Sequence, residues 1–377
     1  MYDLILKNGI VLDCFYPMEK KLDLAISEGK IAAVGTFCED DGRLVLDCTD
    51  CIITPGLIDF HLHLFYRGST LGVPADLALL PNGVTTGIDA GTSGVWNYES
   101  CQALNQFNLS NYYSFINVAS TGLISDDIIE DIDPDHMDED GIKRLVDKYA
   151  GILIGLKIKM GRASVGTLGI APLVRAVEMG EKLSLPVIVH VTDPGAPIDE
   201  IARVLRKGDV FCHVFQGKGE TIFDPDGNIR EQILQARSRG VLFDSCNGNA
   251  NFSLQVALDA KKQGFLSDII SSDLTSNSFY KGYAVSMPVL MSKYLAIGYS
   301  FTEIIQRTTL YPATFLHREK ELGSLLPSTV ADIAVWKIEK TNTIFSDCDH
   351  VSIAGNQLVK PVLTVKDGFI CYRSPEI

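Results

Sequence analysis

One stretch of the sequence combines residue types and spacing that suit metal chemistry, the run Thr54–Phe65 containing His61-Leu-His63. Its apolar residues predict a buried strand, and residues two apart in a strand point to the same face. Two imidazoles would then leave the strand end side by side, as ligands for a divalent transition metal. The pair alone is a weak signal, because histidines among turn residues are often solvated surface groups.

Other polar residues follow at the ends of later apolar runs: Lys157, His190, His213 and Asp273. If these runs are parallel strands, their carboxyl ends meet at one mouth. Polar groups gathered there are hard to explain as core, because burying them without partners is costly. The sequence therefore predicts a metal site. The other three of the seven histidines fall in loop, helix-end and linker contexts and are interpreted as structural: His136, His317 and His350.

Lys157 needs a separate interpretation, because an ammonium would repel metal ions. A buried lysine tends to lose its proton, and the neutral amine can add carbon dioxide to form a carbamate, an anionic ligand able to bridge two cations. The alternative is an ordinary lysine, paired with Asp273 or facing solvent. Lys159 shares the face of Lys157 by strand parity, but Lys157 is nearer the middle of the apolar run and is preferred.

The elements that must position these residues alternate between buried strands and amphipathic helices from about residue 55 to about residue 320. We expect strands at Leu57–His61, Val84–Ala90, Tyr113–Ala119, Ile152–Ile158, Pro186–Val191, Asp209–Phe215, Val241–Ser245 and Asp268–Asp273. Helices are expected between several of them, at Ala171–Leu183, Ile198–Arg206, Glu231–Arg239 and Phe252–Gln263. This α/β pattern predicts a (β/α)8 TIM barrel, whose sites lie at the carboxyl ends of the strands. A doubly wound sheet is the alternative, but the sequence lacks its GxGxxG loop.

Both chain ends show short alternating strands with turns between them, including expected turns at Lys7-Asn-Gly9 and Ser27–Lys30. They predict one small β-sandwich built from residues 1–54 and 321–377, with the barrel, residues 55–320, inserted between them.

Composition excludes several classes of protein. The net charge of −14 argues against nucleic acid or an anionic membrane as partner, and no apolar run is long enough for a membrane span or a signal peptide. Nine cysteines without framework spacing, with a lone Cys48-x-x-Cys51 pair, predict reduced thiols in the cytoplasm. The acidic segment 125–140 is expected to be a solvated loop. The expected partner is a small-molecule substrate, and a homo-oligomer is compatible with these features.

The combination PGxIDxHxH, a strand-four lysine, single histidines on strands five and six and an aspartate on strand eight resembles the amidohydrolase superfamily. Three stretches are similar to its dihydroorotase-like amidohydrolase/deacetylase group: 65–70, 83–91 and 155–159. The resemblance implies a hydrolase that removes acyl groups from small acids with two divalent metals, zinc being preferred. It further implies that His61, His63 and Asp273 hold one metal, that His190 and His213 hold the other, and that carboxylated Lys157 bridges them. Asp273 would also move the proton in catalysis.

The sequence departs from that group after strand seven, where Asn247 in Asp244-Ser-Cys-Asn-Gly248 replaces an expected histidine. Three residues are candidates for substrate contacts: Arg67, Lys159 and Asn247. Two alternatives stay open, a cyclic amidohydrolase that opens dihydroorotate-like rings and a barrel that has lost catalysis and serves as a scaffold.

Overall fold

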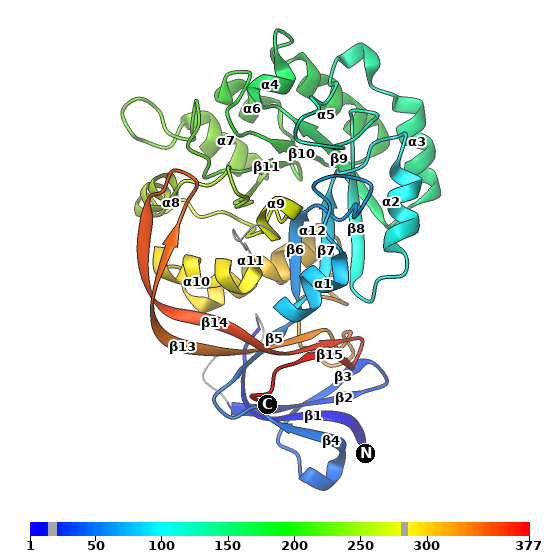
Figure 1. The fold of residues 1–377 in the computed structure, drawn as a ribbon, viewed down its shortest axis with the longest axis vertical. Helices are drawn as coiled ribbons and strands as arrows, with labels where there is room; N and C mark the ends of the chain where they lie inside the picture. The colour runs from blue at the N-terminus through cyan, green and yellow to red at the C-terminus, as the bar shows by residue number, and fades with distance from the viewer. Residues whose placement is uncertain (14–20, 280–285) are drawn as a thin grey trace.

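A curled parallel sheet forms the larger part of the chain in the computed structural model, which describes residues 1–13, 21–279 and 286–377 (Figure 1). Seven strands follow one another in chain order, and every pairing between neighbours is parallel. They are β6 (Leu57–Leu62), β7 (Val84–Ala90), β8 (Asn111–Asn117), β9 (Leu153–Lys159), β10 (Val187–His190), β11 (Val210–Cys212) and β12 (Leu242–Asp244). The strands expected between residues 57 and 245 are thus present, with bounds that differ by up to three residues.

The segment expected as the eighth strand, Asp268–Asp273, forms only isolated bridges rather than a regular strand. It nevertheless bonds to both edge strands of the sheet: Asp268 N donates to Phe243 O over 2.8 Å, and Asp273 N donates to His61 O over 2.7 Å. The left-handed backbone of Asp273, with φ of 51°, interrupts the extended geometry that a longer strand requires.

Helices return the chain from strand to strand around the outside of this sheet (Figure 1). The longer ones have the amphipathic pattern that buries one face, and α11 begins with a capping box between Ser300 and Glu303. The helices are α1 (Ala75–Leu79), α2 (Tyr98–Asn105), α3 (Glu139–Lys148), α4 (Arg162–Val165), α5 (Ala171–Leu183), α6 (Ile198–Val204), α7 (Glu231–Arg239), α8 (Leu254–Lys262), α9 (Ser276–Phe279), α10 (Met287–Ile297), α11 (Phe301–Thr308) and α12 (Leu310–Phe315), with short 3₁₀ turns η1 (Glu39–Asp41), η2 (Leu80–Asn82) and η3 (Pro134–His136).

The second sheet takes its strands from both ends of the chain (Figure 1). Its order is β15-β14-β13-β5-β1-β2-β3, and β4 also pairs with β1. The strands are β1 (Tyr2–Val11), β2 (Lys21–Ser27), β3 (Lys30–Gly35), β4 (Gly42–Asp47), β5 (Ile52–Pro55), β13 (Ile333–Ser346), β14 (Ser352–Lys366) and β15 (Phe369–Arg373). The expected sandwich is therefore observed as one connected sheet, and the division at residues 54 and 320 stays a prediction.

One expected turn is wrong. β1 runs through Lys7-Asn-Gly9 without reversing, because the extra residue is absorbed by a bulge between Leu6 and Gly9 in its pairing with β2. Asn8 takes up the irregularity with φ of 62°, a conformation that asparagine tolerates better than most residues. The turn expected at 27–30 is present between β2 and β3, with Glu28 and Gly29 both at positive φ.

The two sheets are joined by packing and not only by the chain. Trp336 of β13 is fully buried, donates from Nε1 to Thr54 Oγ1 over 2.8 Å, and lies so close to Gly83 that a Cβ there would come within 2.2 Å of its ring. The hairpin of β13 and β14 also reaches the outer helices, because Asp347 near its tip accepts a hydrogen bond from Leu254 N at the start of α8.

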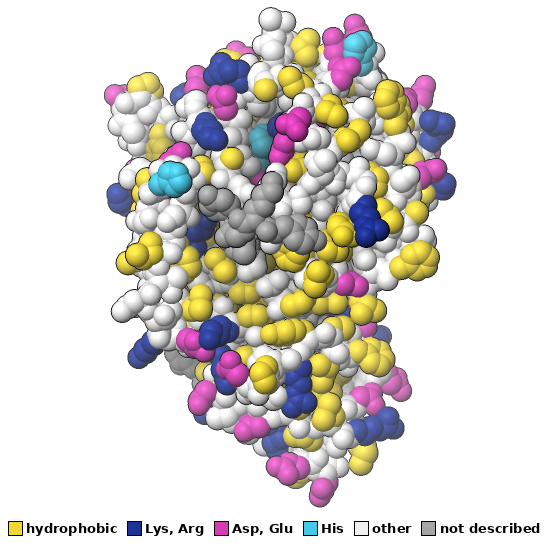
Figure 2. All heavy atoms as spheres, viewed as in Figure 1, with side chains coloured by type: hydrophobic (Ala, Val, Ile, Leu, Met, Phe, Trp, Pro, Cys, Tyr) yellow, Lys and Arg dark blue, Asp and Glu magenta, His cyan; other side chains and the backbone are white. Residues whose placement is uncertain are grey.

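No helix in the described part of the chain has the length and apolarity that crossing a bilayer requires. On the face shown in Figure 2, Lys and Arg side chains are interspersed with Asp and Glu. The cysteines of the described residues are all free thiols, and Cys14 lies outside those residues.

Candidate metal centre

The six predicted ligands come together at the carboxyl ends of the parallel strands. Five of them line one cavity of about 320 Å³: His61, His63, Lys157, His190 and Asp273. The sixth, His213, is fully buried, and its ring centroid lies 4.2 Å from that of His190. Figure 2 shows histidine and acidic side chains together in a hollow of this face. The geometry gathers these residues as expected, while their role as ligands stays a prediction.

Short distances link the members of this group. His63 Nε2 lies 3.3 Å from Asp273 Oδ1, and His61 Nε2 lies 3.9 Å from the same oxygen. His61 Nε2 is also 3.4 Å from Lys157 Nζ. Imidazole nitrogens and a carboxylate oxygen at such separations can share a divalent ion. His61, His63 and Asp273 therefore form one cluster of candidate ligands, and Lys157 lies beside the same Nε2 atom of His61.

A hydrogen-bond chain fixes the tautomer of His63. Thr92 Oγ1 donates to Asp89 Oδ2 over 2.7 Å, so it accepts from His63 Nδ1 over 2.8 Å. The proton on Nδ1 leaves the Nε2 lone pair free, and Nε2 is the nitrogen that faces Asp273. Outer-shell partners of this kind orient metal-binding histidines and raise their basicity.

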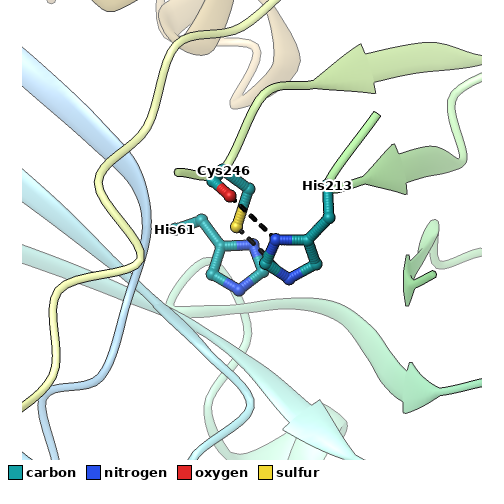
Figure 3. Close-up of side chains that lie close together, drawn as sticks. All are labelled: His61, His213 and Cys246. Atoms are coloured by element: carbon teal, nitrogen blue, oxygen red, sulfur yellow. Dashed lines mark hydrogen bonds between the residues drawn. The ribbon is translucent and has the colours of Figure 1, made fainter. Parts of the chain in front are cut away.

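His213 is oriented in the same way by the backbone. Its Nδ1 donates to the carbonyl oxygen of Cys246 over 2.8 Å, which leaves Nε2 without a proton. Figure 3 shows His213 and His61 with their rings beside Cys246. The Sγ of Cys246 lies 3.6 Å from His213 Nε2. The thiol therefore lies beside the free nitrogen.

His61 carries the clearest unsatisfied group of the site. Its Nδ1 is buried without a hydrogen bond, and the nearest carboxylate oxygen, Asp244 Oδ2, is 3.6 Å away. Buried polar atoms are rarely left unpaired in this way without a functional reason. This nitrogen lies on the Asp244 side of the ring, whereas Nε2 faces Asp273 and Lys157 and is the atom placed to bind a divalent ion with them.

The electrostatics of the site keep His61, His190 and His213 neutral. Burial, followed by the charge of Lys157, lowers the pKa of His61 well below its ordinary value. Burial lowers the pKa of His213 to about 4, and that of His190 falls well below its ordinary value through burial and the neighbouring His213. Neutral imidazole is the form that binds metal. The histidines are thus ready to bind metal at neutral pH.

The carboxylates beside these histidines differ in charge. Burial acts to raise the pKa of Asp273, but the neighbouring side chains of His63, His213 and Lys157 lower it overall, so Asp273 is ionised. Burial raises the pKa of Asp244 to about 8, although hydrogen bonds from Ser271 oppose the shift. Asp273 is therefore the carboxylate suited to bind a cation or accept a proton.

Two glycines make room for the cluster. Gly91, at φ of 79°, lies so close to Lys157 that a Cβ would come within 2.5 Å of the lysine Cβ. Gly248, at φ of 56°, would bring a Cβ within 2.3 Å of Asp273 Oδ2. Both positions also have the left-handed backbone that disfavours other residues. These glycines let the Lys157 and Asp273 side chains enter the cavity.

Only one of the three predicted substrate contacts lines the cavity, namely Lys159. Arg67 is exposed, and its guanidinium lies 5.4 Å from the ring centroid of Tyr66. Asn247 is buried, but its amide nitrogen donates to Tyr294 Oη over 3.3 Å on α10. Arg67 and Asn247 do not line this cavity, and their contact with substrate stays a prediction.

Sequence reasoning missed other residues of the cavity. Glu130 lies in the acidic segment 125–140, expected to be a solvated loop, yet it is buried: Oε1 accepts from Asn117 Nδ2 over 2.7 Å, and Oε2 lies 3.4 Å from Lys159 Nζ. Asn251 donates to Asp273 Oδ2 over 2.8 Å. Their sequence surroundings carry no signal for this placement, because loops bring them in. The histidines interpreted as structural do not line the cavity.

Comparisons with known proteins agree with this geometry, although no protein-family model matches the chain. The chain is 29% identical to a protein named deacetylase from Enterococcus faecalis, over 98% of this chain and 99% of that protein. It superposes on the crystal structure of an adenine deaminase with a TM-score of 0.90 and 28% identity, covering 99% and 100% of the two chains. A crystal structure of a dihydroorotase superposes with a TM-score of 0.88 and 26% sequence identity, with 98% of each chain covered.

Proposed function

We propose that this chain is a metal-dependent deacetylase. It belongs to the dihydroorotase-like group of the amidohydrolase superfamily. It hydrolyses the amide or ester bond of a small acylated acid. The observation that carries the proposal is the gathering of four histidines, Lys157 and Asp273 at one mouth, with three of the imidazoles neutral and an ionised carboxylate.

The ligands divide between two divalent cations, preferably zinc. His61, His63 and Asp273 would hold one, His190 and His213 the other, and a carbamate on Lys157 would bridge them. When bound, such a pair of cations lowers the pKa of water and polarises the carbonyl of the substrate. Lys157 is buried with its Nζ beside His61, which supports carbamate formation from the amine and carbon dioxide.

Asp273 moves the proton in this proposal. Its ionised carboxylate faces the cavity between His63 and Asn251 and can accept the proton of the attacking water. The hydroxide oxygen then joins the acyl carbon, the bond to nitrogen or oxygen breaks, and Asp273 returns the proton to the leaving atom. Thr92 and Asp89 keep the Nδ1 proton of His63 in place throughout, so the ring stays in one tautomer.

Substrate orientation falls to residues at the cavity rim. Lys159 is partly exposed and lines this cavity, so it is placed to pair with the acid group of the substrate. Glu130 holds Lys159 in position from the buried side. These assignments take the place of Arg67 and Asn247 as the proposed contacts with substrate.

Two other functions are less well supported. A scaffold that has lost catalysis would be expected to have lost ligands, yet all six are present. A cyclic amidohydrolase agrees with the name of one similar structure. However, the Enterococcus faecalis relative, which also matches almost the whole chain, is named deacetylase, and Arg67 does not line the cavity, where it could bind a ring carboxylate.

We also infer that the parallel sheet closes as a (β/α)8 barrel. The segment from Asp268 to Leu274 supports closure, because it bonds to β12 on one side and to β6 on the other. Ser271 and Ser272 add hydrogen bonds to Asp244 and Asp59 on those two strands. Closure would bring the ligands of the first strand next to Asp273.

The test combines metal analysis with a substrate panel. The full-length chain should bind two equivalents of zinc and hydrolyse N-acyl or O-acyl acids, with no ring opening of dihydroorotate or hydantoins. Bicarbonate should increase metal occupancy if Lys157 is carboxylated. Ring opening without deacylation would favour the cyclic amidohydrolase, and a protein that binds no metal would refute the proposal.

A further inference from the structure

Cys246 follows strand β12 and lies inside the metal centre, although its sequence context indicated only a reduced thiol. Its side chain is fully buried, and its Sγ lies 3.6 Å from His213 Nε2. One ring nitrogen each of His61 and His213 lies with this sulfur in a group whose atoms are all within 4.8 Å of one another (Figure 3). Three donor atoms therefore converge on one small volume.

The hydrogen bond of His213 shows which atom faces the sulfur. Because Nδ1 donates to the carbonyl of Cys246 itself, Nε2 carries a lone pair. Without metal, the thiol can donate its hydrogen to that lone pair. A cation between the two atoms would take the place of this hydrogen and contact both of them.

The observed spacing suits such a shared cation. Zinc binds histidine nitrogen at about 2.0–2.1 Å and cysteine sulfur at about 2.3 Å, which at tetrahedral angles puts the two ligand atoms about 3.5 Å apart. The distance between His213 Nε2 and Cys246 Sγ is 3.6 Å. Little movement of either side chain is needed for both atoms to bind one ion.

We propose that Cys246 is a seventh ligand of the centre and binds, as thiolate, the same ion as His213. The inference rests on the proposed metal-dependent function, and it makes the His190 and His213 site a mixed nitrogen and sulfur site. On binding, the S–H bond breaks, an S–metal bond forms, and one proton is released to solvent. Soft sulfur ligands select zinc over magnesium and manganese.

Cobalt(II) substitution tests this assignment directly. Metal-free full-length protein loaded with two equivalents of cobalt(II) should show the near-ultraviolet charge-transfer band of a thiolate ligand, and Cys246→Ser should lose it. Cys101→Ser is the matched control, because Cys101 is equally buried but contacts Tyr112 and Asn105 away from the centre. Cys212 belongs to a second group of possible metal ligands, with His61 and Asp244. If Cys212→Ser lost the band and Cys246→Ser kept it, the proposal would be refuted.

A second measurement does not depend on how the variants fold. X-ray absorption of the zinc-loaded wild-type protein should show one sulfur neighbour at about 2.3 Å, and nitrogen and oxygen neighbours alone would overturn the inference. Loss of a direct ligand should also weaken zinc binding by more than the roughly 10- to 100-fold typical of outer-shell partners. Metal binding and deacylation without a sulfur neighbour would refute only the role of Cys246, while a sulfur neighbour in an inactive protein would refute only the proposed hydrolysis.

Discussion

Thr92 should control how tightly the centre holds metal, although it is not a ligand. Its buried hydroxyl accepts from His63 Nδ1 and donates to Asp89. Thr92→Val replaces this hydroxyl by a methyl group of similar size, so the main change is the loss of both hydrogen bonds. The Nδ1 hydrogen of His63 is then buried without an acceptor, and the ring is free to change tautomer and turn.

The magnitude follows from the contacts that remain. Leaving a buried donor unpaired costs about 1–3 kcal/mol of folding free energy, and loss of an outer-shell partner weakens metal binding by about 10- to 100-fold. Asp89 still accepts from the backbone nitrogens of Leu64 and Thr92, each at 2.7 Å. Because these bonds keep the loop in place, we expect a zinc affinity reduced by about tenfold, equivalent to about 1.4 kcal/mol.

The assay is a competition titration of metal-free protein against a chromophoric zinc chelator, with unfolding measured in parallel. Thr86→Val is the matched control: Thr86 is on β7, is equally buried, and loses one hydrogen bond from Asn111 Nδ2, but it does not contact a ligand. Thr92→Ser should keep the hydroxyl and most of the affinity. If Thr92→Val and Thr86→Val bind zinc as tightly as the wild-type protein, the orienting role of Thr92 is refuted.

Three further predictions follow from the same structure. Lys157→Ala should lose metal and hydrolysis together, with partial recovery on adding short carboxylic acids, whereas Lys159→Ala should retain metal and raise KM; full activity of Lys157→Ala would contradict the carbamate. Asp273→Asn should lower kcat by about 10²- to 10⁴-fold while part of the metal remains, and near-normal turnover would exclude Asp273 as the proton carrier. Burial lowers the pKa of Lys293 from 10.5 to about 8, with Asp347 opposing the shift. The stability contributed by its neutral form is thus present above pH 10.5 and lost as the pH falls through 8. Lys293→Met should therefore raise the free energy of unfolding by about 1–3 kcal/mol at pH 7 but not at pH 10.5. The exposed control, Lys320→Met, should not show this gain at pH 7.

The parts of the centre that the sequence could predict are those governed by strand periodicity. His61 and His63 share a face because they are two residues apart at the end of β6, and the ends of parallel strands bring Lys157 and His190 to the same mouth. Their distance along the chain does not matter, since the sheet order alone sets which strand ends are neighbours. This is why the gathering of the candidate ligands could be predicted without a structure.

Residues beyond the strand ends could not be placed by this reasoning. Asn247 lies between Cys246 and Gly248, both at positive φ, so the alternation of a strand no longer tells which way its side chain points. Glu130 is carried into the cavity by a loop whose other acidic residues are exposed or only partly buried. The bulge in β1 is a similar case, because Asn-Gly is read as a turn unless the pairing partner is known.

β5 pairs with β1 on one edge and with β13 on the other, so its second edge can be paired only late in synthesis. The pairing joins Pro55 to Ile333 and Ile52 to Trp336, so one edge of β5 stays open until almost the whole chain has left the ribosome. An open strand edge is a template for association with other chains, and contacts this distant in sequence slow folding. The nascent chain therefore carries the unpaired edge of β5 while its parallel sheet is being made, although β1 can already pair with β2, β4 and β5.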